Sequence, residues 1–246
     1  MPALPPYIIE PIFEQFQALL PDRVVHHPLG CHKPRIPDRV ILEKLVQILV
    51  FGCAYRRIAE EGCSATAIRD RRDEWIELGV MEALRQIALS AYDRFIGLEL
   101  EEVAVDGKGI PIGSISAGAN RHDSPLLVPT LEHAAVSVGS LPEEASIHRD
   151  RAYDSFLTRE RLRERNLIAQ ISKKGQPAPL QSGQRWVSER TNSWHNAHKK
   201  LVWCMERVGR VIDFWVAFSE VVIIVRRLIR EGWMRYRWEG RPPRRP

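Results

Sequence analysis

The sequence predicts an α/β protein in which a helical, helix-turn-helix-like domain precedes a domain with a mixed sheet. Apolar residues recur at helical spacing from Asp38 onward. Two short alternating runs end on aspartates, at Asp106 and Asp150. A strand, a helix and a second strand follow one another between residues 145 and 171. Because the connections between them are short, we expect the two strands to pair in parallel, which is the α/β arrangement.

The composition is that of a globular chain with locally concentrated positive charge. The 246 residues are 44% hydrophobic and 27% charged, which excludes a disordered chain, and their formal net charge is +5. Arginines gather after residue 225, an arrangement that suits either phosphate neutralisation or a solubilising tail. Four cysteines without a CxxC pair, and no signal-peptide pattern, predict a cytoplasmic location. The apolar stretch 211–225 contains Asp213 and Glu220, which predicts a buried helix and no membrane span.

Four segments are predicted along the chain. They are an irregular, proline-rich segment over residues 1–36 with a short helix near residues 12–20, a helical domain over 37–98, a sheet-containing domain over 99–233, and a basic tail over 234–246. The helical domain begins with a helix after Asp38 and closes with a helix over residues 81–95. The residues of that closing helix predicted to face the core are Leu84, Ile87, Ala88, Ala91 and Phe95.

The middle of the helical domain has the outline of a helix-turn-helix. A short helix from Tyr55 to Glu61 is followed by a turn with Gly62, and Ser64 is a good cap for a longer second helix. If the second helix reads DNA, Thr66 and Arg69 near its start would contact base edges or phosphates. An ordinary helical hairpin is the alternative interpretation.

The stretch from residue 103 to residue 115 predicts a β-hairpin. Val103 and Val105 alternate up to Asp106, Gly107 and Gly109 favour a tight turn, and an apolar alternation then resumes at Ile110, Ile112 and Ile115. Asp106 is therefore either a turn residue or a group at the carboxyl end of a strand, where open α/β sheets place ligands.

The remaining elements follow in order. They are a helix over 124–138 capped by Asp123 or Ser124, a strand over 145–150, a helix over 155–165, a strand over 167–171, and two closing helices over 184–205 and 208–233. The helix over 184–205 has an apolar stripe made of Val187, Thr191, Trp194, Leu201, Val202 and Met205. Glu189 lies on the opposite, polar face, where it either forms an ion pair with Arg185 or serves a site.

Asp106, Asp150 and Glu189 together could form a metal site. Two aspartates at strand ends and one glutamate on a helix supply the oxygen ligands that Mg²⁺ prefers. Two such ions about 3.5–4 Å apart can promote displacement at a phosphodiester. The spacing of the three acids makes this chemistry plausible without requiring it.

Three motifs of the chain resemble a known family. They are Gly118-Ala-Asn-Arg-His-Asp-Ser124, His148-Arg-Asp-Arg-Ala-Tyr-Asp-Ser155 and, most specifically, Arg185-Trp-Val-Ser-Glu-Arg-Thr-Asn-Ser-Trp-His195. With the basic end at Arg226–Arg230, they are similar to the insertion-sequence DDE transposases of the IS-five group. The resemblance runs from about Pro34 to the C-terminus.

The resemblance implies an RNase H-like sheet domain and a metal-dependent transposase. Asp106, Asp150 and Glu189 would be its three catalytic acids and would hold two Mg²⁺ ions, for which Mn²⁺ can substitute. The partners implied are double-stranded DNA, as terminal inverted repeats and target, and a second copy of the chain in a homodimer. The residues expected to hold phosphates are Lys173, Lys174, Arg185, Arg190, Lys199 and Lys200.

The sequence departs from the family pattern near Asp106. Relatives have a further strand between two similar Val-Asp-Gly sequences, and here both are fused through the single Val105-Asp106-Gly107. We therefore hypothesise an internal deletion that removes one strand. Smaller departures are Ala152, where relatives have glycine, and the polar Arg149 in a strand.

A DNA-binding remnant without catalytic activity is the alternative function, and an unrelated helix-turn-helix regulator is a third.

Overall fold

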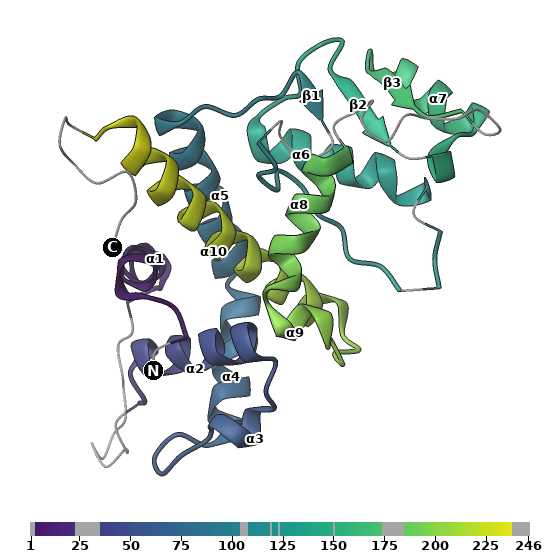
Figure 1. Cartoon of the computed structure of the whole chain (residues 1–246). Helices are drawn as coiled ribbons and strands as arrows, with labels where there is room; N and C mark the ends of the chain where they lie inside the picture. The colour runs from purple at the N-terminus through teal and green to yellow at the C-terminus, as the bar shows by residue number, and fades with distance from the viewer. Residues whose placement is uncertain are drawn as a thin grey trace. The chain divides into compact units, whose positions relative to one another are not determined.

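The computed structural model describes residues 3–22, 35–103, 108–118, 120–122, 124–149, 151–173 and 185–237 (Figure 1). The chain forms two compact units. The first unit contains residues 1–87 and 196–225, and the second contains residues 88–195 and 226–246. The domain boundaries predicted from the sequence, at residues 36, 98 and 233, stay predictions.

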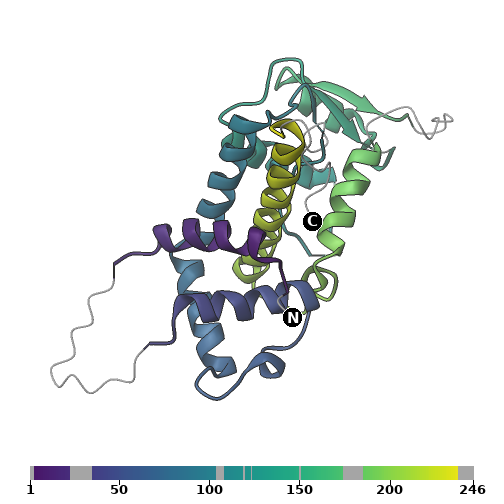
Figure 2. The ribbon, with the colours of Figure 1, turned by 60° about the vertical axis from the view of Figure 1, so that its left-hand side comes forward.

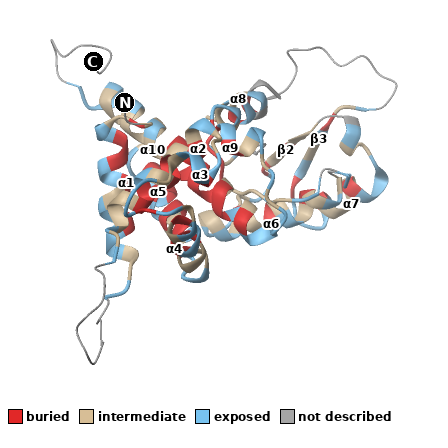
Figure 3. Ribbon diagram, turned by 90° about the horizontal axis from the view of Figure 1, so that it is seen from below, coloured by how far each residue is buried: buried red, intermediate tan, exposed pale blue. Residues whose placement is uncertain are grey.

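The first unit is helical in the part of the chain that the structure describes. Its helices are α1 (Pro6–Leu19), α2 (Asp38–Phe51), α3 (Tyr55–Ile58), α4 (Ala65–Glu77), the first half of α5 (Val80–Phe95), α9 (Lys199–Val202) and most of α10 (Gly209–Arg235). The predicted apolar stripe of α2 is confirmed, because Ile41, Leu42, Leu45 and Leu49 are fully buried (Figure 3). No described helix is both long enough and apolar enough to cross a membrane.

Helix α1 is longer than the sequence indicated. The segment before residue 36 was expected to be irregular with a helix near residues 12–20, whereas α1 spans Pro6–Leu19. Pro6 occupies the first helical position, where its missing N–H costs no hydrogen bond, so it starts the helix instead of breaking it. The apolar side of α1 is buried, and Phe16 packs edge-on against Trp75 of α4 at 4.5 Å between ring centroids.

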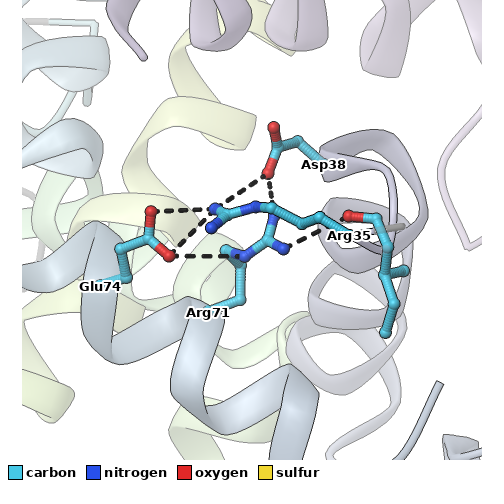
Figure 4. Close-up of polar contacts among 5 residues, drawn as sticks. Arg35, Asp38, Arg71 and Glu74 are labelled. Carbon is cyan, nitrogen blue, oxygen red and sulfur yellow. Dashed lines mark hydrogen bonds and ion pairs between the residues drawn. The ribbon is translucent and has the colours of Figure 1, made fainter. Parts of the chain in front are cut away.

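An ion-pair cluster joins the start of α2 to α4 (Figure 4). Arg71 of α4 pairs with Asp38, the first residue of α2, and donates to the carbonyl oxygen of Ile36 at 3.3 Å. Arg35 lies alongside, 2.9 Å from Glu74 and 3.7 Å from Asp38. Burial of the Arg71 guanidinium, with the nearby positive charge of Arg35, lowers the pKa of Arg71 from its ordinary value. The two acids offset this cost by pairing with both arginines.

The connection between α3 and α4 is a tight turn. Glu60 and Cys63 exchange two backbone hydrogen bonds of 3.1 and 3.0 Å, and Gly62 between them has a φ of 81°. Because residue 59 is already extended, α3 ends at Ile58 and not at residue 61 as predicted. The predicted cap is confirmed, since the Ser64 hydroxyl accepts a hydrogen bond from the Ala67 amide at 3.1 Å.

The buried side of α5 differs from the prediction. Phe95 is 51% exposed and Ile87 is also exposed, although both were expected to face the core. Arg85 instead is fully buried, bonds to Glu82 at 2.7 Å and lies 3.6 Å from the buried carboxylate of Glu220 on α10. An arginine breaks the apolar pattern that sequence periodicity relies on, so the stripe was assigned about one residue out of phase.

The second unit contains a three-stranded parallel sheet. Its strands are β1 (Glu102–Val103), β2 (Ser146–Arg149) and β3 (Ile168–Ile171), in the order β1-β2-β3. Helix α7 (Phe156–Arg163) connects β2 to β3, and the predicted parallel pairing of these strands is confirmed, with Ser146 opposite Ile168. The Ser155 hydroxyl caps α7 by accepting from the Thr158 amide. Figures 1 and 2 show the three strands side by side.

The second arm of the predicted hairpin is not a strand. Residues 108–118 belong to no helix or strand, and the described sheet is purely parallel, not mixed. Ile110 and Ile112 are nevertheless buried, and Gly113 lies so close to α6 (Leu127–Val138) that an added Cβ would be 2.6 Å from the Ala134 amide. The apolar residues of this segment are therefore buried by packing against a helix. Residues 109–112 are all buried, which differs from the alternating burial of a half-exposed strand.

Two further helix predictions need correction. A 3₁₀ turn over Ser124–Leu126 precedes α6, so Leu126 and not Ser124 is its cap residue. The predicted helix over 184–205 is two helices, α8 (Arg185–Asn196) and α9, because His198 is extended between them. His198 is buried, with its Nδ1 atom 2.7 Å from the Ser219 hydroxyl. Beyond this break the predicted apolar stripe fails, and Met205 is 88% exposed.

The ion-pair cluster of Figure 4 makes the stability of the first unit depend on Arg71. Arg71→Ala is expected to lower the free energy of unfolding by about 1–3 kcal/mol, because it leaves Asp38 and the Ile36 carbonyl without their buried donor. Urea denaturation measures this loss. Arg210→Ala, which removes the partner of Glu77 in an exposed pair, is the control and should cost less than about 0.5 kcal/mol. Equal losses would contradict the importance of the cluster.

Candidate functional site

The strands β1 and β2 end at the same edge of the sheet. They pair in parallel with Val103 opposite Ile147, so their carboxyl ends point the same way. Asp106 and Asp150 themselves lie outside the described residues. In the sequence, Asp106 follows Val103 by three residues, and Asp150 follows Ile147 by three residues. The two aspartates are therefore 44 residues apart, as are the paired residues Val103 and Ile147.

Glu189, the third predicted acid, lies on the exposed side of α8. The side chain of Arg185, its suggested i, i+4 partner, is outside the described residues. The structure records no ion pair between Glu189 and a side chain that it describes. Glu189 is therefore open to solvent on a helix whose other side is held in place.

Helix α8 is tied to the residues that follow Asp106. Arg190 donates from its guanidinium to the carbonyl oxygen of Lys108, and the Thr191 hydroxyl donates to the carbonyl oxygen of Gly109 at 2.6 Å. Gly109 has a φ of 85°, and a Cβ there would be 3.1 Å from both of these side chains. Arg190 and Thr191, which directly follow Glu189 in the sequence, thus hold Lys108 and Gly109, which lie two and three positions after Asp106.

Lys108 is also held from its other side. Its ammonium donates to the carbonyl oxygen of Gly97 at 3.0 Å and lies 3.3 Å from Glu99. The approach to β1 and the segment after Asp106 are therefore linked by one side chain. Sequence reasoning missed this docking, and its one local signal was Thr191, a hydroxyl residue within the apolar stripe of α8.

A second set of contacts supports α8 from α10. Trp194 lies between two guanidinium groups, with Arg190 at 5.2 Å and Arg227 at 5.1 Å from the ring. Arg227 forms an ion pair with Glu231, and the Tyr92 hydroxyl donates to Glu231 at 2.7 Å. Arg190 is thus fixed by the carbonyl that it binds and by the ring that it covers.

The α3–α4 pair presents the other predicted DNA-contacting residues. Thr66 and Arg69 are exposed on α4, whereas Ile68, Arg72 and Trp75 are buried. The Arg69 guanidinium covers the ring of Tyr55 at 4.8 Å, and Arg72 donates to the Tyr55 hydroxyl. Burial raises the pKa of Tyr55 to about 12, so this hydroxyl stays protonated at neutral pH.

The other predicted phosphate-binding residues differ in their surroundings. Lys173 after β3 and Lys199 on α9 are exposed, and Lys174 is outside the described residues. Lys200 is buried, lies 2.6 Å from Glu206 and approaches the ring of Trp215 at 5.5 Å. Lys200, like Arg190, is therefore engaged by partners within the chain. Lys173 and Lys199 are exposed, although the Lys199 ammonium also donates to the carbonyl oxygen of Asn196 at 3.3 Å.

The described residues contain no group of three His, Cys, Asp or Glu side chains that could hold a metal ion. Two of the three predicted acids lie outside those residues, so the predicted set remains a prediction. Its donor chemistry, three carboxylates, fits a hard divalent cation.

The comparisons with known proteins give one match. Over 104 residues, the chain is 31% identical to a curated protein of Burkholderia cepacia described as "Putative transposase for insertion sequence element IS402". The aligned part is 40% of this chain and 49% of that protein, so the chain spans about half the length of the relative it matches. No protein-family model and no solved structure matches the chain. The match supports the resemblance to insertion-sequence transposases as a broad class.

The docking of α8 gives Gly109 a special role in the second unit. Gly109→Ala is expected to lower the free energy of unfolding by about 1–3 kcal/mol, because alanine is strained at this φ and its Cβ presses on Arg190 and Thr191. Gly139→Ala is a matched control, since Gly139 has a φ of 86° and no atom within 4 Å of an added Cβ.

Hydrogen exchange distinguishes the two variants. Only Gly109→Ala should accelerate exchange of the α8 amides, because only Gly109 contacts that helix. Equal losses of stability with unchanged exchange in α8 would show that α8 does not depend on this contact.

Proposed function

We propose that the chain is a transposase of an insertion element, which cleaves and joins DNA with Asp106, Asp150 and Glu189 as its catalytic acids. The observation that carries the proposal is the docking of α8. Arg190 and Thr191, the two residues after Glu189, hold the backbone at Lys108 and Gly109, close in sequence to Asp106. The partial match to the transposase of Burkholderia cepacia supports the same class.

The strand register supports the pairing of the two aspartates. Val103 and Ile147 are direct partners, and Asp106 and Asp150 each follow them by three residues. In a parallel ladder, positions equally far from a pair face the same side of the sheet on neighbouring strands, about 4.8 Å apart. A ladder continued to these positions would place both carboxylates together.

In the proposed reaction, the three carboxylates would hold two Mg²⁺ ions, which when bound would activate the attacking oxygen and stabilise the leaving one. A water oxygen attacks the phosphorus at the element end, the bond from phosphorus to the 3′ oxygen breaks, and that oxygen leaves as a 3′-hydroxyl. The oxygen of this hydroxyl then attacks the phosphorus of a target phosphodiester and loses its proton. The bond from that phosphorus to the target's own 3′ oxygen breaks, and the displaced oxygen takes up the proton and leaves as a 3′-hydroxyl. In this proposal, Lys173 and Lys199, which are exposed, contact phosphates without reading sequence.

Recognition of the element ends is assigned in this proposal to the α3–α4 pair. Its support is the tight turn at Gly62, the Ser64 cap and the exposure of Thr66 and Arg69 at the start of α4. The active form on DNA is proposed to be a homodimer, because an element has two ends to be processed together.

The internal deletion near Asp106 is also part of the proposal. Between α5 and the 3₁₀ turn at Ser124, the described residues contain one strand, β1. The hypothesis predicts that longer relatives carry an additional strand between two Val-Asp-Gly sequences. A neighbouring element copy with the same flanks and no such insertion would contradict the deletion.

A strand-transfer assay tests the catalytic assignment. With Mg²⁺ or Mn²⁺ and DNA carrying the element ends, Glu189→Gln is expected to lower the cleavage rate on the order of 10³-fold, because one ligand charge is lost. Glu164→Gln, which neutralises another exposed glutamate, is the control and should leave the rate unchanged. Cleavage that survives Glu189→Gln removes Glu189 from the mechanism. Wild-type protein that binds DNA without cutting it favours the inactive DNA-binding remnant.

A further inference from the structure

The end of α10 and the two residues after it carry the densest positive charge in the described chain. Residues 226–237 contain five arginines and one acidic residue, Glu231. The structure divides these arginines into two groups with different roles. The anchoring arginines are Arg227 and Arg235, and the outer arginines are Arg226, Arg230 and Arg237.

The anchoring arginines fix the end of α10 within the second unit. Arg227 pairs with Glu231 and covers the Trp194 ring. Arg235 donates to the carbonyl oxygens of Ile96 at 2.9 Å and Phe95 at 3.3 Å, and the Tyr236 hydroxyl donates to Phe95 at 2.9 Å. The yellow end of α10 accordingly lies beside α5 in Figures 1 and 2.

The outer arginines are exposed, and among the described residues the structure records no ion pair or hydrogen bond for their side chains. Arg226 and Arg230 are one helical turn apart, about 6 Å along the axis, and Arg237 follows the helix end by two residues. Glu231, the acid that could neutralise them, is engaged by Arg227 and Tyr92. The outer side of this segment is therefore positive without a nearby counter-charge from its own residues.

We propose that the outer arginines form a binding site for the phosphate backbone of duplex DNA, separate from the α3–α4 pair and from the three acids. This proposal rests on the proposed function, because DNA is its ligand. Successive charges on one DNA strand are about 3.4 Å apart along the duplex axis, so two arginines one turn apart can each reach a different phosphate. Because the helix is already anchored, little conformational freedom is lost on binding.

The site fixes DNA without reading its sequence. Guanidinium groups on one helix side contact phosphate oxygens, which are the same for every base pair. The expected consequence is a strong dependence of affinity on salt, because each neutralised phosphate releases condensed counterions.

Fluorescence anisotropy with a labelled duplex of arbitrary sequence, in EDTA and over a series of salt concentrations, tests the proposal. The plot of the logarithm of the binding constant against the logarithm of the salt concentration has a negative slope. Replacing Arg226, Arg230 and Arg237 by glutamine should make this slope shallower by about 2.7, or about 0.9 for each lost contact. Affinity at 0.1 M salt should then fall on the order of 10²-fold. Circular dichroism and the melting temperature should stay unchanged, because the outer arginines hold no contact that the fold needs.

The matched control replaces Arg161, Arg163 and Arg165 of α7 and the turn after it by glutamine. It removes the same charge from another helical surface of the second unit, where Arg163 pairs with Glu160, and Arg165 pairs with Glu132 and donates to the carbonyl oxygen of Arg161. It should leave the salt slope within about 0.5 of the wild-type value. An equal loss in both triple variants would overturn the proposal, since binding would then follow total charge and not a site.

The remaining outcomes separate this proposal from the proposed function. One outcome is that the triple variant shows the expected loss of salt slope while the wild-type protein binds DNA but never cuts it. This outcome supports the arginine site and contradicts the catalytic assignment. Wild-type protein that cuts DNA while the triple variant keeps its full slope overturns the arginine site alone. Tighter binding to phosphatidylserine vesicles than to DNA, lost in the triple variant, would also overturn it, because the surface would then serve a membrane.

Discussion

The arrangement of the second unit depends on two hydrogen bonds to main-chain oxygens. Arg190 and Thr191 bind the carbonyls of Lys108 and Gly109, and this contact joins a helix to a segment that belongs to no helix or strand. Backbone acceptors that are shielded from water need a partner, so the loss of either donor would leave a polar group unsatisfied. Strand pairing contributes little to the position of this segment, because β1 has two residues. The position of the segment after Asp106 is thus set by α8 more than by strand pairing.

Local signals in the sequence predicted the elements better than their contacts. The stripe of α2, the Ser64 cap and the parallel pairing of β2 with β3 were predictable because each depends on neighbouring residues or on short connections. The hairpin after Asp106 was predicted wrongly, because the spacing of Ile110 and Ile112 in the sequence is that of a strand, whereas residues 109–112 are all buried without strand pairing. The break at His198 was missed because its cause, a bond to Ser219, lies 21 residues further along the chain.

The candidate site shows the same division. The three acids are predicted from motifs and strand ends and stay a prediction, whereas the placement of Glu189 on an exposed helical side is confirmed. The groups that hold this helix, including Trp194 with its two arginines, were not found, because they come from α10 and from the segment at Lys108. The buried arginines Arg71 and Arg85 were also not predicted, because nothing in the neighbouring sequence indicates which charged side chains have a buried partner.

The distance in sequence between the two ends of the α8 contact has a consequence for folding order. Residues 108 and 190 are separated by 82 positions, whereas β2, α7 and β3 form from 26 consecutive residues between 146 and 171. Closing a large loop costs more chain entropy than forming a local unit, and contacts far apart in sequence slow the search for them. We therefore expect the strand–helix–strand unit to assemble early and α8 to dock late. In a nascent or partly unfolded chain, the surroundings of the three acids would become ordered only after the strand–helix–strand unit had formed.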